Sequence, residues 1–556
     1  MRRLALLLAA CLLALPAHAQ DEPPELPETA AFGVLKLLQH SRIEDAAREA
    51  RKLDDDDPLT PYARASLAFH RGDYDAAAEA LPDPMGHPEI ERRLAYLRRN
   101  IEGAARAVEG MLERVEGNFK IRFAPTADAI LVDYALDALE GQRTYMGRLL
   151  GVVPGGPTLI EFMPDVESFL AASGLPAAWV ETTNTVAISK WDRLIVLSPM
   201  NMRRGYAWKD TLAHEYVHYA LSRASHDRLP VWFQEGSAKV LEGRWRDPRG
   251  GDHLGLRSET LLARAVAEDR LISFDDMHPS MAALPSSQDA ALAFAEVATA
   301  IDYLLEHGEA KGYRSVVDET RRHGDVMRAI LTVLGPAPGG FEGRFRRHLK
   351  TLNLKERAEV ADLREQITVG AAVSDDDGSK GMDRVLKEDR RMQDHARVGD
   401  LLRSRSRMNA ALIEYRRAER AGRFHSPELA NKIARTLHAL RRIDDAREVL
   451  LSSVDLYPDY TPTVSLLARL AYEGDDPREV VRRGARAIAL NPFDPDVHHV
   501  LLQAHRALGD EAAAAHEERV LQVLADHLGR RMRGLRPITP VGRSAPEPAA
   551  EETSTE

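Results

Sequence analysis

Four short segments of the chain have the pattern of strands: residues 119–123 alternate apolar and basic residues, and the other three are short, largely apolar runs. Each segment is bounded by Gly, Pro, Asn or Asp, the residues that form turns. The segments cover residues 119–123, 158–162, 185–189 and 193–198. A helical period runs over residues 127–150 and ends at Gly151, and helical patterns dominate from Trp208 to about Leu352. We therefore expect residues 117–352 to fold as one α+β domain.

Helical periodicity with regularly placed Ala continues outside this domain. Within residues 391–525, Tyr457-Pro458 recurs as Asn491-Pro492 at an offset of 34 residues. A period of about 34 residues, with Ala where helices pack and Pro between units, is typical of tetratricopeptide repeats, and about three to four copies fit. Residues 31–116 carry a weaker, Ala-rich version of the pattern. We expect both flanking regions to be all-α, with helical repeats of this type.

The N-terminus has the pattern of a secretory signal peptide. A basic start is followed by an unbroken apolar run, Leu4–Leu15, and by small residues at Ala17 and Ala19. The run is too short for a membrane-spanning helix, which needs about 20 apolar residues. We predict cleavage after Ala19, which makes residues 1–19 the signal and the mature protein periplasmic or secreted. The segment that ends at Cys11 resembles a bacterial lipobox, so lipid anchoring at Cys11 is the alternative.

Three other segments have the composition of linkers or tails. Residues 20–30 are rich in Pro and acidic residues, and residues 353–390 combine a helix end with several Gly and Asp. Residues 535–556 are rich in Pro, Ala and Glu. We expect these segments to be a disordered lead-in, a linker and a disordered tail, respectively.

The composition excludes several classes of function. Apolar residues make up 44% and charged residues 29% of the 556 residues, as in an ordinary soluble globular protein. The formal charge of −11 provides no basic field that would attract nucleic acid. After the signal, no apolar stretch reaches the length of a transmembrane helix. Because the only Cys, Cys11, lies in the signal, the mature chain has no disulfides and no thiolate metal ligands.

The strongest indication of chemistry is the sequence H-E-x-x-H at residues 214–218. On a helix, His214 and His218 lie on one face, so that both imidazoles can reach one metal ion. Glu215 then lies beside the metal, where a carboxylate can take a proton from an activated water. The flanking residues are apolar, which predicts a buried helix in which three polar side chains need a common task.

A second motif, W-F-Q-E-G-S-A-K-V-L-E, follows at residues 232–242. Pro230 can begin a new helix, on which Glu235 would be presented as a third metal ligand. Two His and one carboxylate leave one position of a tetrahedral zinc ion open, as a catalytic site requires. Glu242 lies two turns after Glu235 on the same face. Its carboxylate either supports a ligand histidine or is a surface group that is solvated or forms a salt bridge.

Together the two motifs resemble those of the gluzincin metallopeptidases, whose second motif reads roughly W-[LF]-x-E-G-x-A-x-Y-x-E. The resemblance implies a zincin-like α+β domain that binds one Zn²⁺ per chain through His214, His218 and Glu235, with Glu215 as general base. Residues 117–352 are also similar, more diffusely, to bacterial "peptidase MA-like" proteins, which combine this domain with tetratricopeptide repeats.

Two departures from the gluzincin pattern concern the substrate and the oxyanion. The G-[AG]-M-E-N motif that holds the free amine of a substrate in aminopeptidases is absent, which favours endopeptidase activity. Phe294 stands where a Tyr is expected, and Phe has no hydroxyl to stabilise an oxyanion. Tyr303, His226 and Tyr219 are the remaining candidate donors.

The sequence thus predicts an exported zinc metallopeptidase that hydrolyses peptide bonds in a protein or peptide substrate. An edge strand at Thr185–Ser189 or Leu194–Ser198 would bind the substrate as an added strand. The repeats would bind a protein partner or the substrate. The alternative is a periplasmic repeat scaffold whose peptidase-like domain is inactive or uses zinc only structurally. Phe294 and the large share of repeat sequence favour the scaffold, whereas the intact Glu215 favours the enzyme.

Overall fold

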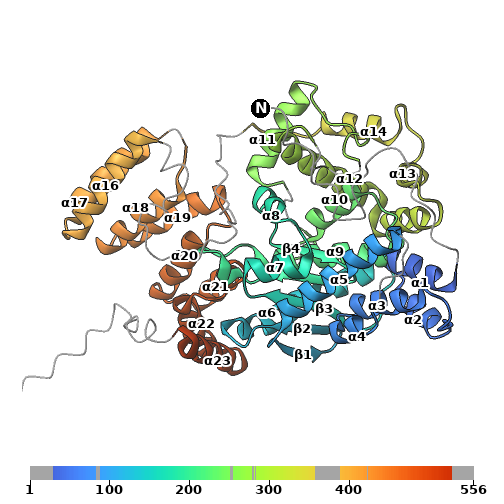
Figure 1. The fold of residues 1–556 in the computed structure, drawn as a ribbon. Coiled ribbons are helices and arrows are strands. Elements are labelled where there is room, and N and C mark those ends of the chain that lie inside the picture. Colours follow the sequence, from blue (N-terminus) through green and yellow to red (C-terminus); the bar gives the residue numbers. More distant parts are fainter. Residues whose placement is uncertain are drawn as a thin grey trace, which may run out of the picture.

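The computed structural model describes residues 29–528, except for residues 83–87, 251–253, 279–280, 282–283, 357–388 and 423 (Figure 1). The described part is mostly helical and contains a small mixed sheet, which agrees with an α+β arrangement flanked by helical repeats. The predicted signal at residues 1–19, Cys11, most of the linker and the tail at residues 535–556 lie outside the described residues. Thr29 caps the first helix, which begins at Ala30, inside the predicted lead-in.

A five-stranded sheet lies at the centre of the α+β part. Its strands are β1 (Leu112–Glu116), β2 (Phe119–Phe123), β3 (Thr158–Met163), β4 (Ala187–Lys190) and β5 (Arg193–Leu197). Their order is β1-β2-β3-β5-β4. Strands β2, β3 and β5 are parallel, and the two edge strands run antiparallel to their neighbours. The four predicted strands are present as β2 to β5.

Strand β1 lies within residues 31–116, which the sequence predicted to be helical throughout. That prediction was wrong at its C-terminal end, because the preceding helix ends at Val108. Strand β1 forms a hairpin with β2 through Gly117, whose φ of 57° is in the left-handed region that favours glycine. All residues of β1 are exposed. No buried face therefore imposes the hydrophobic alternation by which a strand is recognised in a sequence.

Helices cover both faces of the sheet (Figure 1). They are α5 (Pro88–Val108), α6 (Leu131–Leu150), α7 (Val166–Ser173) and α9 (Trp208–Ser225). One face of the sheet packs against α6 and α9, and the other packs against α5 and α7. Strand β3 is buried along its whole length, as a central parallel strand covered on both faces should be. Helix α9, which carries the H-E-x-x-H sequence, therefore lies on the sheet next to the edge strand β4.

The chain after α9 forms a helical layer that covers the outer side of this helix. The layer consists of α10 (Val231–Leu241), α11 (Leu256–Ala267), α12 (Ser287–His323), α13 (Val326–Leu334) and α14 (Gly340–Leu349). Helix α10 packs on both α9 and α12, and its apolar residues belong to the same core as the sheet. The second predicted motif is thus placed directly beside the first.

A buried carboxylate joins the N-terminal helices to the sheet. These helices are α1 (Ala30–Gln39), α2 (Ile43–Ala50), α3 (Thr60–His70) and α4 (Tyr74–Glu79). Glu161 of β3 is fully buried and accepts hydrogen bonds from the Tyr74 hydroxyl at 2.6 Å and from Nη1 of Arg122 at 3.1 Å. Its other oxygen lies 3.2 Å from Nε of Arg193. Two guanidinium groups thus compensate one buried carboxylate, which makes its burial tolerable.

The C-terminal region consists of antiparallel helix pairs that follow one another along the chain. The pairs are α16 (Arg390–Ser404) with α17 (Met408–Ala421), α18 (Pro427–Ala439) with α19 (Ile443–Leu456), α20 (Thr461–Glu473) with α21 (Pro477–Leu490), and α22 (Pro495–Leu508) with α23 (Glu511–Leu528). Helices α18, α20 and α22 begin 34 residues apart, at the predicted period. Each has one Pro at its first or second position, where a backbone N–H has no partner within the helix. The later pairs lie against the α+β part, and α16 and α17 lie farthest from it (Figure 1).

The length of the apolar stretch in a helix decides whether that helix can cross a membrane. A helix that spans the hydrocarbon core of a bilayer needs about 20 predominantly apolar residues. Within the part of the chain that the structure describes, none of the helices meets this requirement. The prediction that no transmembrane helix follows the signal is confirmed for these residues.

The buried Glu296 of α12 gives a prediction about stability and pH. Its side chain is 2% exposed and accepts a hydrogen bond from the backbone N–H of Ile272 at 3.0 Å. Burial raises the pKa of this carboxyl to about 8, from an ordinary value of 4.5. The native state therefore holds a proton that the unfolded chain loses above pH 4.5, so native stability falls as pH rises toward 8.

The isosteric variant Glu296→Gln keeps the acceptor for Ile272 and removes this titration. We expect the variant to unfold like the wild type near pH 5 and to be more stable by roughly 3 kcal/mol near pH 8. Urea unfolding at the two pH values measures the difference. The exposed Glu306→Gln on the same helix is the control, and an unchanged pH dependence in Glu296→Gln would contradict the assignment.

Candidate metal centre

Helix α9 brings the two histidines of the first motif together. His214 and His218 lie one turn apart, and their ring centroids are 5.0 Å from each other. The Nε2 atoms are 3.2 Å apart, so both rings direct the same nitrogen to one point. Trp208, Leu212, Tyr216 and Val217 of α9 are buried in the main core, which leaves the histidine face turned toward α10. The predicted arrangement of an i, i+4 histidine pair is therefore present.

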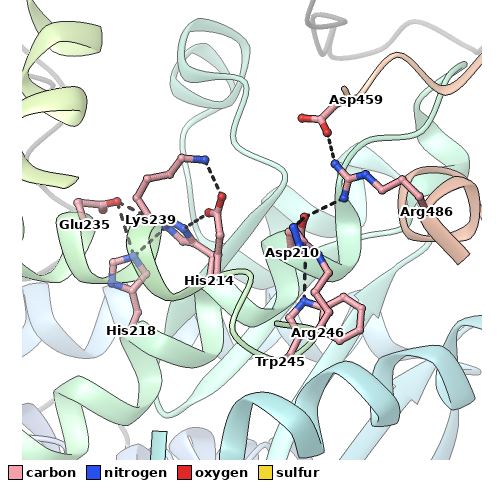
Figure 2. A network of polar contacts seen from close by, with 10 residues as sticks. Asp210, His214, His218, Glu235, Lys239, Trp245, Arg246, Asp459 and Arg486 are labelled. Carbon is pink, nitrogen blue, oxygen red and sulfur yellow. Dashed lines mark hydrogen bonds and ion pairs between the residues drawn. The ribbon is translucent and has the colours of Figure 1, made fainter. Parts of the chain in front are cut away.

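Helix α10 supplies the third side chain of this cluster. Pro230 precedes its first residue, as the sequence predicted. At Gly236, a Cβ atom would lie 2.5 Å from the carbonyl oxygen of Val297 in α12 and 2.8 Å from Ile301. Only glycine therefore allows α10 to come this close to α12. Glu235, the residue before this contact, is turned toward α9 (Figure 2).

The three predicted ligands have their donor atoms close together (Figure 2). Oε2 of Glu235 lies 3.6 Å from Nε2 of His214 and 3.7 Å from Nε2 of His218. Donor atoms about 2.0–2.2 Å from one tetrahedral zinc ion are separated by about 3.3–3.6 Å. The three donor atoms and their spacing therefore fit zinc. In the described part of the chain, they are the one group of His, Cys, Asp and Glu side chains with metal-ligand spacing.

Glu242 lies behind His214 and contacts the other nitrogen of its ring. Oε2 of Glu242 is 3.0 Å from Nδ1 of His214, and Oε1 accepts a hydrogen bond from Nζ of Lys239 at 2.5 Å. A carboxylate on Nδ1 fixes the ring so that Nε2 is free to bind a metal, and it raises the basicity of the imidazole. The sequence left two alternatives for Glu242, a contact with a candidate ligand histidine and a salt bridge. The structure shows both: one oxygen contacts His214 and the other pairs with Lys239.

Charge within the cluster favours a cation. Burial lowers the pKa of His214, but hydrogen bonds with Glu235 and Glu242 outweigh burial and raise the pKa to about 10. Burial raises the pKa of Glu242, yet Lys239 and His214 hold it at about 2. Against the same effect of burial, His218 and His214 keep the pKa of Glu235 well below its ordinary value. Both carboxylates are therefore ionised at neutral pH and stabilise positive charge at His214, the position where a cation could bind.

Glu215 lies between the edge strand and the cluster. Its side chain is 8% exposed, and its carboxylate accepts a hydrogen bond from the backbone N–H of Ser189 in β4. Burial raises the pKa of Glu215, and the charges of His218 and His214 together with the Ser189 N–H offset part of that increase. A carboxylate with a raised pKa, next to a group of side chains that could hold a metal, can act chemically as a general base.

The three candidate oxyanion donors lie on α9 (Tyr219), at its C-terminal end (His226) and on α12 (Tyr303). The Tyr219 hydroxyl accepts from Nη1 of Arg223 at 3.3 Å. His226 caps the C-terminus of α9 with a φ of 55°, and the ring of Tyr303 packs on His307 at 4.2 Å. Within the described residues, none of the three candidates is hydrogen bonded to a predicted ligand. Phe294 is 40% exposed.

The structure separates the two segments proposed as a substrate-binding edge. Strand β4, which includes Ser189, is at the edge of the sheet, whereas β5 is paired on both sides, with β3 and β4. A strand with both neighbours in place has no free backbone groups for a peptide. The alternative at Leu194–Ser198 was therefore wrong, and the edge next to Glu215 is β4.

Some polar contacts at this centre were not identified from the sequence. Lys239 and Glu242 are three residues apart on one helix, a spacing that indicates an ion pair. Asp210 is one helical turn before His214, but its partners Trp245 and Arg246 come from a distant segment. No local pattern indicates that contact, because the tertiary fold alone brings the two segments together.

Removal of the Glu242 carboxylate should weaken metal binding. We expect Glu242→Ala to lower the affinity for zinc by about 10–100-fold, because Nδ1 of His214 loses the group that orients the ring. Glu242→Gln keeps an acceptor and should lose less. Competition with a chromophoric chelator measures the affinity. The exposed Glu268→Ala serves as the control, and equal affinities in Glu242→Ala and wild type would contradict the role of Glu242.

Comparison with models of known protein families gives no match, and no curated protein matches the chain significantly. The interpretation of this centre therefore depends on its own residues: two imidazoles and one carboxylate with zinc-like spacing, and a buried glutamate beside them.

Proposed function

We propose that the protein is a zinc-dependent metallopeptidase of the gluzincin type. The observation that carries the proposal is the convergence of Nε2 of His214, Nε2 of His218 and Oε2 of Glu235 within 3.7 Å of one another. Glu215, on the same helix, adds the base that a purely structural metal site does not need. His214, His218 and Glu235 would hold Zn²⁺, one ion per chain, in the zincin-like α+β part.

Different residues of the chain have different roles in the proposed peptide hydrolysis. A bound zinc ion supplies a Lewis acid that polarises a carbonyl group and lowers the pKa of water. Glu215 accepts a proton from the attacking water and then delivers it to the leaving amine. The raised pKa of Glu215 suits this double task, because the carboxyl can both take and release a proton. Glu242 and Lys239 keep the His214 ring in place meanwhile.

The edge strand β4 supports an endopeptidase. An extended peptide that pairs with an exposed edge binds through its main chain, without a requirement for a free terminus. Ser189 of β4 already contacts Glu215 through its N–H. A peptide bond of a substrate that adds to β4 therefore comes close to the base and to the ligands.

The helical pairs at residues 390–528 support a binding role for the C-terminal region. Their 34-residue spacing is that of tetratricopeptide repeats, which stack into concave surfaces for protein ligands. We include in the proposal that this surface binds a protein partner or the substrate, and that the mature enzyme is exported to the periplasm or secreted.

Two substitutions test the enzyme. Glu215→Gln should retain about one zinc ion per chain and lower peptide hydrolysis by at least about 10²-fold, because the base is lost. His214→Ala should lose the zinc ion as well as activity. Elemental mass spectrometry of the purified protein gives the metal content, and mass spectrometry of a digested peptide mixture gives the activity.

The matched controls are Glu268→Gln and His278→Ala, both at exposed positions away from the cluster. Absence of zinc from the wild type, even after exposure to micromolar zinc, would refute the metallopeptidase. Zinc retention without hydrolysis by wild-type protein would favour the alternative, a repeat scaffold in which the metal is structural.

A further inference from the structure

The residues that lead into helix α9, and its first residue, contact helix α21 of the C-terminal repeats. The carbonyl oxygen of Leu490 in α21 accepts a hydrogen bond from the backbone N–H of Tyr206 at 2.9 Å. Nε1 of the fully buried Trp208 donates to the carbonyl oxygen of Ile488 at 2.8 Å. At Gly205, a Cβ atom would lie 2.1 Å from the same Leu490 oxygen. The first turn of α9 thus cannot shift without breaking contacts with the repeat.

Asp210 forms the polar centre of this junction. It lies one turn before His214 and is 7% exposed. Its carboxylate accepts from Nε1 of Trp245 at 3.1 Å, from Nη2 of Arg246 at 2.9 Å and from Nη1 of Arg486 at 3.1 Å. Trp245 and Arg246 follow Glu242, the residue that supports the His214 ring. Asp210 therefore ties together helix α9, the segment that follows α10, and the repeat helix α21.

Arg486 connects this centre to a second carboxylate of the repeats. Its Nη1 binds Asp210, and its Nη2 binds Asp459, in the turn between α19 and α20 (Figure 2). A planar guanidinium can hold two carboxylates at fixed angles, which a flexible ammonium group cannot do. Figure 2 shows this set of contacts beside the one that contains His214 and Lys239. The negative charges of Asp459 and Asp210 also contribute to the raised pKa of Lys239, after the larger effect of Glu242.

We infer that Arg486 and Asp210 are positioning residues of the metal centre, through which the C-terminal repeats set the relation between the His214 helix and Glu242. The inference rests on the metal-binding part of the proposed function and not on hydrolysis. The repeats then have a task in addition to any binding of partners. They complete the support of the ligand helix, although Arg486 follows Asp210 by 276 residues in the sequence.

The helix that carries Arg486 also provides a matched control. Arg482 lies one turn earlier on α21, is more exposed, and pairs with Glu479 on its own helix. Arg482→Gln removes the same charge from the same helix but leaves the junction intact. A general effect of charge or of helix stability would appear in both variants, whereas an effect through Asp210 appears only in Arg486→Gln.

The experiment uses the full mature chain with zinc as the probe. Affinity is measured by chelator competition for wild type, Arg486→Gln, Asp210→Asn, Arg486→Lys and Arg482→Gln. We expect Arg486→Gln and Asp210→Asn to weaken zinc binding by at least about fivefold. Arg486→Lys should recover part of the loss, and Arg482→Gln should match wild type. In peptide hydrolysis, Arg486→Gln should lower kcat and leave KM unchanged.

The outcomes separate this inference from the proposed function. Zinc affinities of Arg486→Gln and Asp210→Asn within twofold of wild type, or an equal loss in Arg482→Gln, would overturn it while the zinc site stands. A wild type that binds zinc but hydrolyses no peptide would overturn the proposed peptidase activity. The zinc affinities of the variants would then still decide whether Arg486 and Asp210 position the metal site. A wild type that binds no zinc would overturn both. If Asp210→Asn fails to fold, Arg486→Gln, which changes a partly exposed side chain, decides the matter.

Discussion

The close packing of α10 between α9 and α12 is the contact on which the cluster of His214, His218 and Glu235 depends. It exists because Gly236 has no Cβ: the nearest backbone oxygen of α12 would be 2.5 Å from such an atom. Interiors are packed so tightly that even one methyl group must be accommodated by a shift. A shift of α10 would move Glu235, and its carboxylate would leave the two imidazoles of α9. One small residue thus fixes the distance between α12 and α10, the helix that carries Glu235.

Near this contact, two carboxylates lie beside one imidazole and one ammonium group. Glu235 and Glu242 are ionised beside His214, and Lys239 neutralises the outer carboxylate only. Buried charges are costly unless paired. The two carboxylates are paired here with Lys239 and with His214, whose pKa they raise to about 10.

The same principle appears where the flanking regions meet the α+β part. Glu161 is compensated by Arg122 and Arg193 on the side of the N-terminal helices, and Asp210 by Arg246 and Arg486 on the side of the repeats. In both cases a carboxylate with little solvent contact is held by two guanidinium groups. Contacts of this kind specify one relative arrangement of the parts, because any other arrangement would leave a charge without its partner.

Local pattern was sufficient for much of this architecture. Strands β2 to β5 were predicted because each is a short, largely apolar run between turn-forming residues, with clear alternation in β2. The pairing of His214 with His218, the helix that begins after Pro230, and the 34-residue spacing of the repeats are likewise consequences of periodicity along one element. These features depend on neighbours within a turn, a strand or a repeat, and the amino-acid sequence determines them directly.

The tertiary structure alone decided the rest, for a common physical reason. Strand β1 has no buried face, and the edge position belongs to β4 rather than β5. The contact of Glu242 with Nδ1 of His214 and that of Arg486 with Asp210 join residues 28 and 276 positions apart. Such contacts are set by how whole helices and strands pack, and periodicity within one element carries no information about its neighbour in space.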